Sequence, residues 1–215
     1  MTHEEMERCG RLAVRICWSQ MERRKKCELL VAMWRRSTGR LEEHTMPEGA
    51  GPILNSGRAK RMVFHFLRRW AGADPDIEAV ILASDQWYAR ATPEGMMHQE
   101  EMAHGAVDRG FQNWLAKGWA TRHEAVIASV QTREEVLIVR QLYTRREHKP
   151  FIVADGELEL DWMTQEHFGG RQKMFGDFRP DNLGENPEDQ MTMDQLDEEL
   201  IKHLDAMNKE ESRTA

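Results

Sequence analysis

The sequence predicts an α+β fold in which a mostly antiparallel sheet carries helices on one face, with a further amphipathic helix near the C-terminus. Two observations lead to this prediction. Between residues 27 and 162, short apolar or alternating runs are separated by turns that are too short for the crossovers of parallel strands. Two longer segments, 3–22 and 56–70, repeat apolar residues every three or four positions, as helices packed on a sheet do.

The first helix is expected at residues 3–22, because Thr2 and Glu5 have the spacing of a capping box. The chain has three cysteines and no C-x-x-C pair, which argues against a disulfide framework or a zinc site. We therefore interpret the cysteines as reduced core residues. The apolar stripe of this helix consists of Met6, Cys9, Leu12, Ala13, Ile16, Cys17 and Met21.

A β-hairpin and a second helix are expected next. The hairpin strands lie near 27–34 and 40–46, around a turn rich in Ser, Thr and Gly. A Gly- and Pro-rich loop then leads into the helix at 56–70, which Gly72 ends.

The next strand is expected at residues 78–84, where a continuous aliphatic run is typical of a central strand that is buried on both faces. Residues 93–119 are expected to form a helical excursion from the sheet. Further strands are expected at 124–130 and 136–143, and two short runs, 151–153 and 158–162, can extend the same sheet.

The expected organisation is one α/β domain at 1–168, a linker at 169–190 and an acidic tail at 191–215. The net charge of −7 is distributed unevenly, with +6 in residues 1–74, −2 in 75–150 and −11 in 151–215. No run approaches the ~20 apolar residues of a membrane span, and no signal sequence is recognised, so a cytoplasmic protein without membrane contact is expected. The tail contains a capped helix at about 192–208 with an apolar stripe of Met193, Leu196, Leu200, Leu204 and Met207.

Two sets of residues are candidates for catalysis or metal binding. Ser84 and Asp85 follow the central strand, where active sites of sheet enzymes gather. No G-x-S-x-G elbow surrounds them, and a Ser-Asp pair at the end of a strand is far more often a turn or a helix cap. The Glu-x-x-His spacing of Glu101 and His104, with His98 one turn earlier, suits metal ligands on one helical face. Such sites need a second Glu-x-x-His and further glutamates, and the best additional candidate is the pair Glu166 and His167, so no cofactor is predicted.

Two surfaces are candidates for macromolecular contacts. The second helix carries a basic face, which suits nucleic acid, while the acidic last third of the chain opposes a phosphate backbone. The apolar stripe of the tail helix suits docking in a groove, either of a partner or of this domain's own basic layer. The basic face consists of Arg58, Arg61, Arg68 and Arg69.

Residues 79–88, Ala-Val-Ile-Leu-Ala-Ser-Asp-Gln-Trp-Tyr, together with the strand at 124–126 and the hairpin at 132–139, resemble uncharacterised bacterial and phage proteins. The central strand of those proteins ends in a Val-Ser-Glu-Ala-Trp-like motif. The resemblance spans residues 25–145, departs at Asp85 and Gln86, and implies no activity. The element order also resembles the roadblock and longin class of scaffolds, which act by dimerising and binding proteins.

The expected function is a non-enzymatic binding or assembly module that acts through protein–protein contacts or self-association, with the tail helix as interaction element. Two alternatives stay open. One is a small hydrolase or metal-dependent enzyme with its site near the end of the 78–84 strand, and the other is a nucleic-acid-associated protein that uses the basic N-terminal layer.

Overall fold

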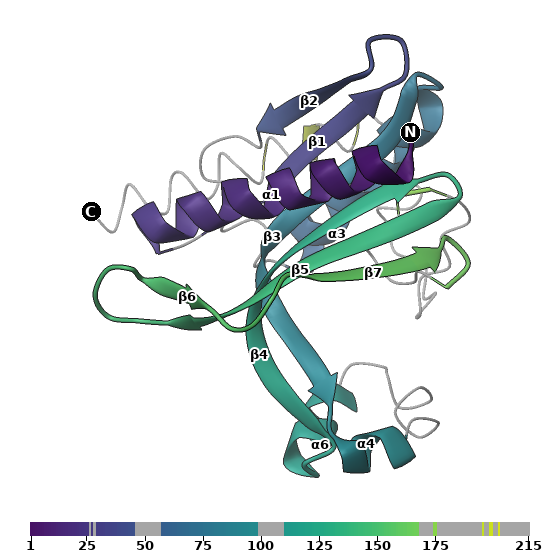
Figure 1. Ribbon diagram of the computed structural model, residues 1–215. Helices are drawn as coiled ribbons and strands as arrows, with labels where there is room; N and C mark the ends of the chain where they lie inside the picture. Colours follow the sequence, from purple (N-terminus) through teal and green to yellow (C-terminus); the bar gives the residue numbers. More distant parts are fainter. Residues whose placement is uncertain are drawn as a thin grey trace.

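The computed structural model describes residues 1–25, 27, 29–45, 57–98, 110–167, 174–175, 195, 198–199 and 202. Seven strands and four helices are defined in these residues, and the expected α+β class is confirmed (Figure 1). Their bounds are α1 (His3–Arg24), β1 (Leu30–Arg35), β2 (Arg40–Thr45), α3 (Gly57–Ala73), β3 (Ile77–Ala91), α4 (Pro93–Met97), α6 (Gly110–Ala116), β4 (Ala120–Thr132), β5 (Glu135–Arg145), β6 (Ile152–Ala154) and β7 (Glu159–Thr164).

The described strands form one sheet in the order β2-β1-β3-β4-β5-β6, and every recorded pair is antiparallel. The same edge of β5 pairs with two short strands. Its first half pairs with β7, and its last residues pair with β6. The short runs expected at 151–153 and 158–162 are therefore strands of this sheet, as predicted.

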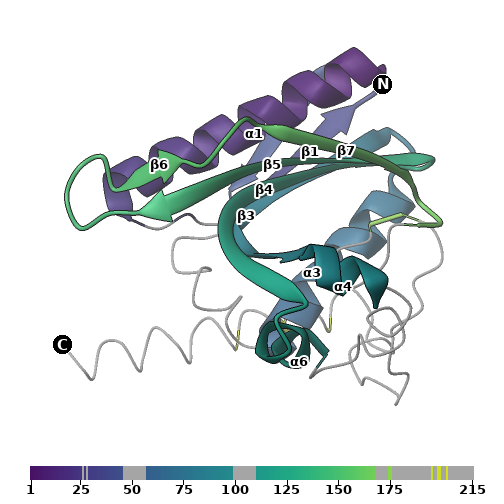
Figure 2. The same ribbon diagram turned by 60° about the horizontal axis from the view of Figure 1, so that its bottom comes forward.

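The helices lie on both faces of the sheet and not on one face, which corrects the expectation from sequence. Successive residues of β1 and β3 point alternately into two separate apolar clusters. Ala32 and Ile81 face α1, whereas Val31 and Val80 face α3. Figure 2 shows α1 and α3 on opposite sides of the sheet. The physical reason is the aliphatic run of β3 itself, because a strand that is apolar on both faces needs cover on both.

The helix α1 begins at the predicted capping box. The Thr2 hydroxyl accepts a hydrogen bond from the Glu5 amide at 3.2 Å, and the Thr2 amide donates to the Glu5 carboxylate at 2.6 Å. That bond to the Thr2 amide lowers the pKa of Glu5. Midway along α1, a Cβ at Gly10 would lie 2.4 Å from Cγ2 of Val139. Glycine therefore allows α1 to approach β5 closely.

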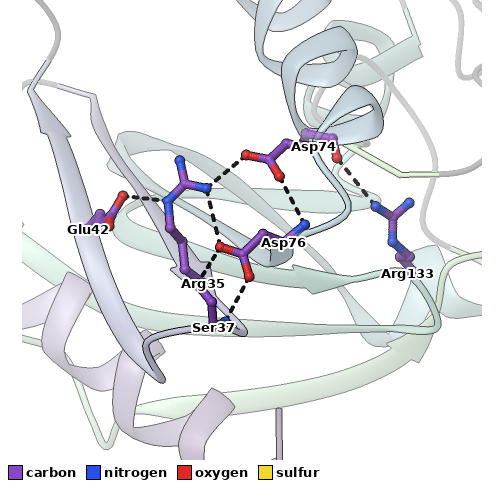
Figure 3. Close-up of polar contacts among 7 residues, drawn as sticks. Arg35, Ser37, Glu42, Asp74, Asp76 and Arg133 are labelled. Atoms are coloured by element: carbon purple, nitrogen blue, oxygen red, sulfur yellow. Dashed lines mark hydrogen bonds and ion pairs between the residues drawn. The ribbon is translucent and has the colours of Figure 1, made fainter.

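A partly exposed polar network joins the β1–β2 turn to the start of β3 (Figure 3). Arg35 contacts Glu42 at 2.7 Å, Asp74 at 2.8 Å and Asp76 at 3.5 Å. The carboxylate of Asp76 also accepts hydrogen bonds from the amide and hydroxyl of Ser37, both at 2.7 Å. The hydrogen bond from Arg35 lowers the pKa of Asp74, and the bonds from Ser37 lower the pKa of Asp76.

The strands β3 and β4 extend beyond the rest of the sheet as a bent arm that carries α4 and α6 at its end (Figure 1). The Thr92 amide donates to the Trp119 carbonyl at 2.9 Å, and the Thr92 hydroxyl caps α4 at Gly95. A Cβ at Gly95 would lie 1.9 Å from the Trp119 carbonyl oxygen. Only glycine lets α4 sit against the start of β4. The expected excursion at 93–119 is thus helical at both of its ends, and residues 99–109 lie outside the described residues.

The face that carries α3 also receives Met174 and Phe175, which are 1% and 3% exposed. The Met174 amide donates to Oε1 of Gln131, a side chain that is fully buried in the middle of the sheet. The side-chain amide nitrogen of Gln131, Nε2, in turn donates to the Ser129 hydroxyl at 3.2 Å. These bonds satisfy polar groups that would otherwise be costly to bury. Residues beyond position 168 therefore contribute to the core.

Candidate protein-binding surface

Two adjoining hollows run along the exposed side of α1 and share Leu12 and Ile16. The first is a small space of about 20 Å³ between α1 and the β2–β1 side of the sheet. Its lining is apolar and mostly buried, and only Leu12, Ile16 and Leu41 reach the surface. Leu12 is 44% exposed, although it belongs to the apolar stripe of the helix. We call the two hollows together the α1 groove. Its apolar lining consists of Leu12, Ala13, Ile16, Leu30, Ala32, Leu41 and Ile81.

The second hollow gives the groove a basic rim. Arg15, Arg23 and Arg24 line it, and all three side chains are exposed. Within the described part of the chain, no ion pair involves these three arginines, whereas the neighbouring Arg11 pairs with Glu7 at 3.7 Å. Positive charge beside exposed apolar side chains suits a ligand with carboxylates around an apolar stripe.

The groove follows from the sequence of α1 and β2. The residues that α1 buries on the sheet form a narrow row that includes Met6, Ala13 and Met21. Leu12 and Ile16 form a second row, one turn apart, beside the first. On β2, Leu41 pairs with Trp34 and points to the α1 face, between Arg40 and Glu42 on the opposite face. Leu12 and Ile16 therefore lie at the side of the buried row, where the sheet does not cover them fully.

Asp85, a predicted catalytic candidate, belongs to a polar network on the α1 face. Its carboxylate accepts a hydrogen bond from the Tyr143 hydroxyl at 2.5 Å and pairs with Arg145 at 2.7 Å. Arg145 also pairs with Glu124 at 2.8 Å and donates to the Lys25 carbonyl at 3.0 Å. Burial, followed by the hydrogen bond to Asp85, raises the pKa of Tyr143 well above its usual range. These contacts tie β3, β4, β5 and the end of α1 together.

Ser84, the second catalytic candidate, is not brought together with Asp85. The two are consecutive in an extended strand, so their side chains point to opposite faces of the sheet. The register places Ser84 beside Ile127 and Asp85 beside Val126, which is a residue of the α1 face. His123 pairs with Tyr88, on the Ser84 side, and its ring contacts the Thr121 hydroxyl at 2.9 Å. The described residues thus do not assemble a nucleophile, base and acid at this strand.

The candidate metal ligands are only partly within the described residues. The His98 ring stacks on Trp119, with ring centroids 4.1 Å apart and planes inclined by 9°. Glu101 and His104 lie outside the described residues. Among the described side chains, no three His, Cys, Asp or Glu residues gather as metal ligands would.

The candidate nucleic-acid residues lie on α3, which covers the face opposite to α1. Arg69 is exposed and Arg68 is half-buried, while the side chains of Arg58 and Arg61 lie outside the described part of the structure. The positive charge of the first 74 residues is therefore divided between two faces.

The tail stripe, Met193, Leu196, Leu200, Leu204 and Met207, lies outside the described residues. The described residues of that segment are Gln195, Glu198, Glu199 and Lys202, and all four are helical. Lys202 Nζ lies 3.3 Å from Oε1 of Glu199, one turn earlier.

Other large apolar side chains are exposed, but they are scattered. Trp87 is 54% exposed under the guanidinium of Arg122, and Met96 and Met97 are 64% and 77% exposed at the end of the arm. Trp162 on β7 is 37% exposed and packs against the His3 ring. Single exposed apolar side chains are common on protein surfaces, whereas Leu12, Ile16 and Leu41 reach the surface side by side at the α1 groove.

Sequence reasoning placed Leu12 and Ile16 in the core stripe of α1 and did not identify them as a surface. The helix buries seven residues on the sheet, and Leu12 and Ile16 are apolar positions beside that buried row. In the part of the chain that the structure describes, no helix has the length and apolar character needed to cross a membrane. Comparison with protein-family models, curated proteins and solved structures finds no significant match to this chain.

Proposed function

We propose that this protein is a non-enzymatic binding module and that the α1 groove is its protein-binding surface. The groove offers Leu12, Ile16 and Leu41 as apolar contacts to a partner's side chains, with three arginines of α1 beside them. Its ligand is therefore an amphipathic helix whose apolar stripe is flanked by carboxylates, because helices bind grooves through residues spaced by three or four positions. The observation that supports this proposal most is Leu12, 44% exposed at the point shared by both hollows.

The rest of the described surface gives less support to catalysis. The one predicted carboxylate of the central strand, Asp85, is occupied by Tyr143 and Arg145. A general acid or base needs a group within reach of a substrate, and the hydrogen bonds of Asp85 go to its own neighbouring strands. The network therefore supports a structural role for Asp85.

An affinity capture with paired variants tests the proposal. Tagged full-length protein and its Leu12→Asp variant are incubated with the same host lysate after nuclease treatment, and the captured proteins are identified by mass spectrometry. Each captured protein is then purified and titrated against both forms. Met97→Asp is the matched control, because it places the same charge at an exposed apolar position in α4.

The expected result is a partner that binds wild type and Met97→Asp equally and binds Leu12→Asp at least about tenfold more weakly, as expected for a buried anchor. The purified partner should contribute an acidic amphipathic helix. Equal binding by all three forms, or loss of capture after nuclease treatment, would contradict the proposal. The second result would favour nucleic acid as the ligand.

A further inference from the structure

We infer that two copies of this chain pair through the outer edge of β2, in an antiparallel register centred on Leu41, and that the pairing joins their two α1 grooves into one surface. The inference rests on the proposed function, because it assigns a second copy of the chain to the edge of the same surface. The position of β2 in the sheet, the order of its charges and the size of the groove in one chain support it.

The strand β2 forms one edge of the sheet. It pairs with β1 on one side, and no other described strand pairs with it (Figure 1). Edge strands present backbone amides and carbonyls to which a further strand can pair, unless their side chains prevent it. The side chain of Arg40 is exposed, and those of Leu41 and Glu42 are half-buried. The side chains of β2 therefore decide whether a second strand can be added and in which register.

The order of charges along β2 favours one two-fold register. In an antiparallel pair of identical strands, the residue at the two-fold axis faces its own copy, and the residues on either side of it face each other. A register centred on Arg40, Glu42 or Glu43 places like charges directly opposite each other, which is destabilising. With Leu41 at the axis, Leu41 faces its copy, and Arg40 of each chain faces Glu42 of the other.

Among the described residues, Arg40 has no ion pair within its own chain. It lies opposite Arg35 in the register of β1 with β2, and Arg35 is the arginine that holds the carboxylates of the network described above. In the paired form, Glu42 of the second copy supplies a carboxylate to Arg40. The two-fold axis repeats this contact, so one register forms two pairs of opposite charges.

The other face of the paired strands gathers exposed apolar side chains. Leu41 points to the α1 face, beside Leu12 and Ile16. The two-fold axis stands perpendicular to the sheet and keeps both α1 helices on one face, so the two sets of apolar side chains lie on the same surface. The short strand pair thus has an apolar contact at its axis as well as the two charge pairs.

Pairing also provides the width that one groove lacks. The apolar space of one chain is about 20 Å³, which is too small for a helix about 10 Å wide. In the pair, β1 and β2 of both copies lie between the two α1 helices and form a floor about 19 Å wide at ~4.8 Å per strand. An amphipathic helix can lie on that floor, with the arginines of both α1 helices beside it.

Sedimentation velocity of the full chain from about 5 to about 200 µM tests the pairing, since a short strand pair makes a small and weak interface. Arg40→Glu and Glu42→Arg each place like charges opposite each other at both pairs. Arg36→Glu is the matched control, because it reverses an exposed arginine in the β1–β2 turn, outside the strand. An equimolar mixture of Arg40→Glu and Glu42→Arg restores opposite charges across the axis.

Wild type and Arg36→Glu should dimerise alike, and each of the two strand variants should dimerise at least about tenfold more weakly. The mixture should regain the dimer, because each chain then faces the opposite charges of the other. Wild type that stays monomeric at the highest concentration would overturn the inference. A dimer that both strand variants retain, or a mixture that stays monomeric, would overturn it as well.

Glu42→Arg also removes the contact with Arg35, so circular dichroism verifies that this variant is folded. An independent readout is Leu41→Cys, because the register places the two copies of this position about 5 Å apart at Cβ. Mild oxidation should convert Leu41→Cys to a covalent dimer and leave Thr38→Cys, in the turn, monomeric. Equal yields of covalent dimer from the two variants would contradict the register.

Partner capture by Leu12→Asp is a separate measurement, so the two proposals can fail separately. Monomeric wild type that still captures a partner through Leu12 would overturn the pairing and leave the proposed function in place. A dimer that pairs through β2 and captures no partner through Leu12 would support the pairing and contradict the proposed function.

Discussion

The hydroxyl of Tyr143 on β5 donates a hydrogen bond to the carboxylate of Asp85 on β3, across the intervening strand β4. Arg145 contacts both groups, at 2.9 Å from the Tyr143 hydroxyl and 2.7 Å from the Asp85 carboxylate. The contact joins three strands at the point where the arm leaves the rest of the sheet. Asp85 therefore holds the sheet together here, next to the end of α1.

Tyr143→Phe tests the stabilising role of this contact. The variant should lose about 1.5–3 kcal/mol of unfolding free energy, as is usual for a hydrogen bond to a charged group. The raised pKa keeps the phenol protonated in the folded state, while the unfolded phenol ionises near pH ~10. The stabilisation is thus complete below pH ~10 and declines above it. Urea unfolding at pH 8 and at pH 10.5 should show a smaller difference between wild type and variant at the higher pH. A difference that grows with pH would contradict this role.

The Arg35 network predicts sensitivity to acid. The pKa values of Asp74 and Asp76 are lowered in the folded state, so their contribution to stability is present above pH ~3.9 and is lost as the pH falls through the lowered values. Asp76→Asn cannot titrate. Its melting temperature should be lower than that of wild type at pH 6, and the difference should narrow between pH 4 and pH 2.5. Parallel melting curves across this range would show that the network does not contribute.

Gly10→Ala tests the close approach of α1 to β5. The added methyl would lie 2.4 Å from Cγ2 of Val139, so either the helix or the Val139 side chain must move. Overpacking of this kind costs about 1–3 kcal/mol, which exceeds the gain of up to ~1 kcal/mol from replacing a helical glycine. Gly72→Ala on α3 is the matched control, because nothing lies within 4 Å of its added Cβ. Thermal unfolding should show a loss for Gly10→Ala and no loss for Gly72→Ala. Equal effects would contradict the packing argument.

The basic rim predicts how partner binding depends on salt. The double variant Arg15→Glu/Arg24→Glu should weaken binding of the captured partner mainly at low ionic strength, since salt screens exposed charges. Arg146→Glu, an exposed arginine after β5, serves as control for a change of charge elsewhere. Titrations at 50 and 500 mM NaCl measure the effect. A variant that binds as wild type does at both concentrations would exclude the rim from the interface.

Local patterns in the sequence predicted most elements of the fold. Thr2 and Glu5 located the start of α1, and the turn after β1 located the hairpin. The central strand was predicted at 78–84 because its apolar run ends there, yet β3 continues to Ala91. The second half of β3 pairs with β4 by backbone hydrogen bonds, which polar residues such as Asp85 and Gln86 form as well as apolar ones do. The pattern of apolar residues therefore does not predict this part of the strand.

The candidate surface was harder to predict because it depends on which part of an apolar stripe the sheet covers. Leu12 and Ala13 are neighbours in sequence and belong to the same stripe, but Ala13 is 2% exposed and Leu12 is 44% exposed. The crossing of α1 over the sheet decides this difference, and the crossing depends on contacts such as Gly10 with Val139. The placement of helices on two faces, by contrast, was implied by β3 itself. A strand that is apolar on both faces predicts cover on both.

Methyl NMR of the full-length protein tests the central claim most directly, because it reports on the groove itself. Addition of the captured partner to the wild-type protein should shift the methyl signals of Leu12, Ile16 and Leu41, and the signals of Met96 and Met97 should not move. The same addition to Leu12→Asp should leave the Ile16 and Leu41 signals unchanged. Groove signals that do not respond to the partner in wild type, or changes centred on Met96 and Met97, would contradict the account.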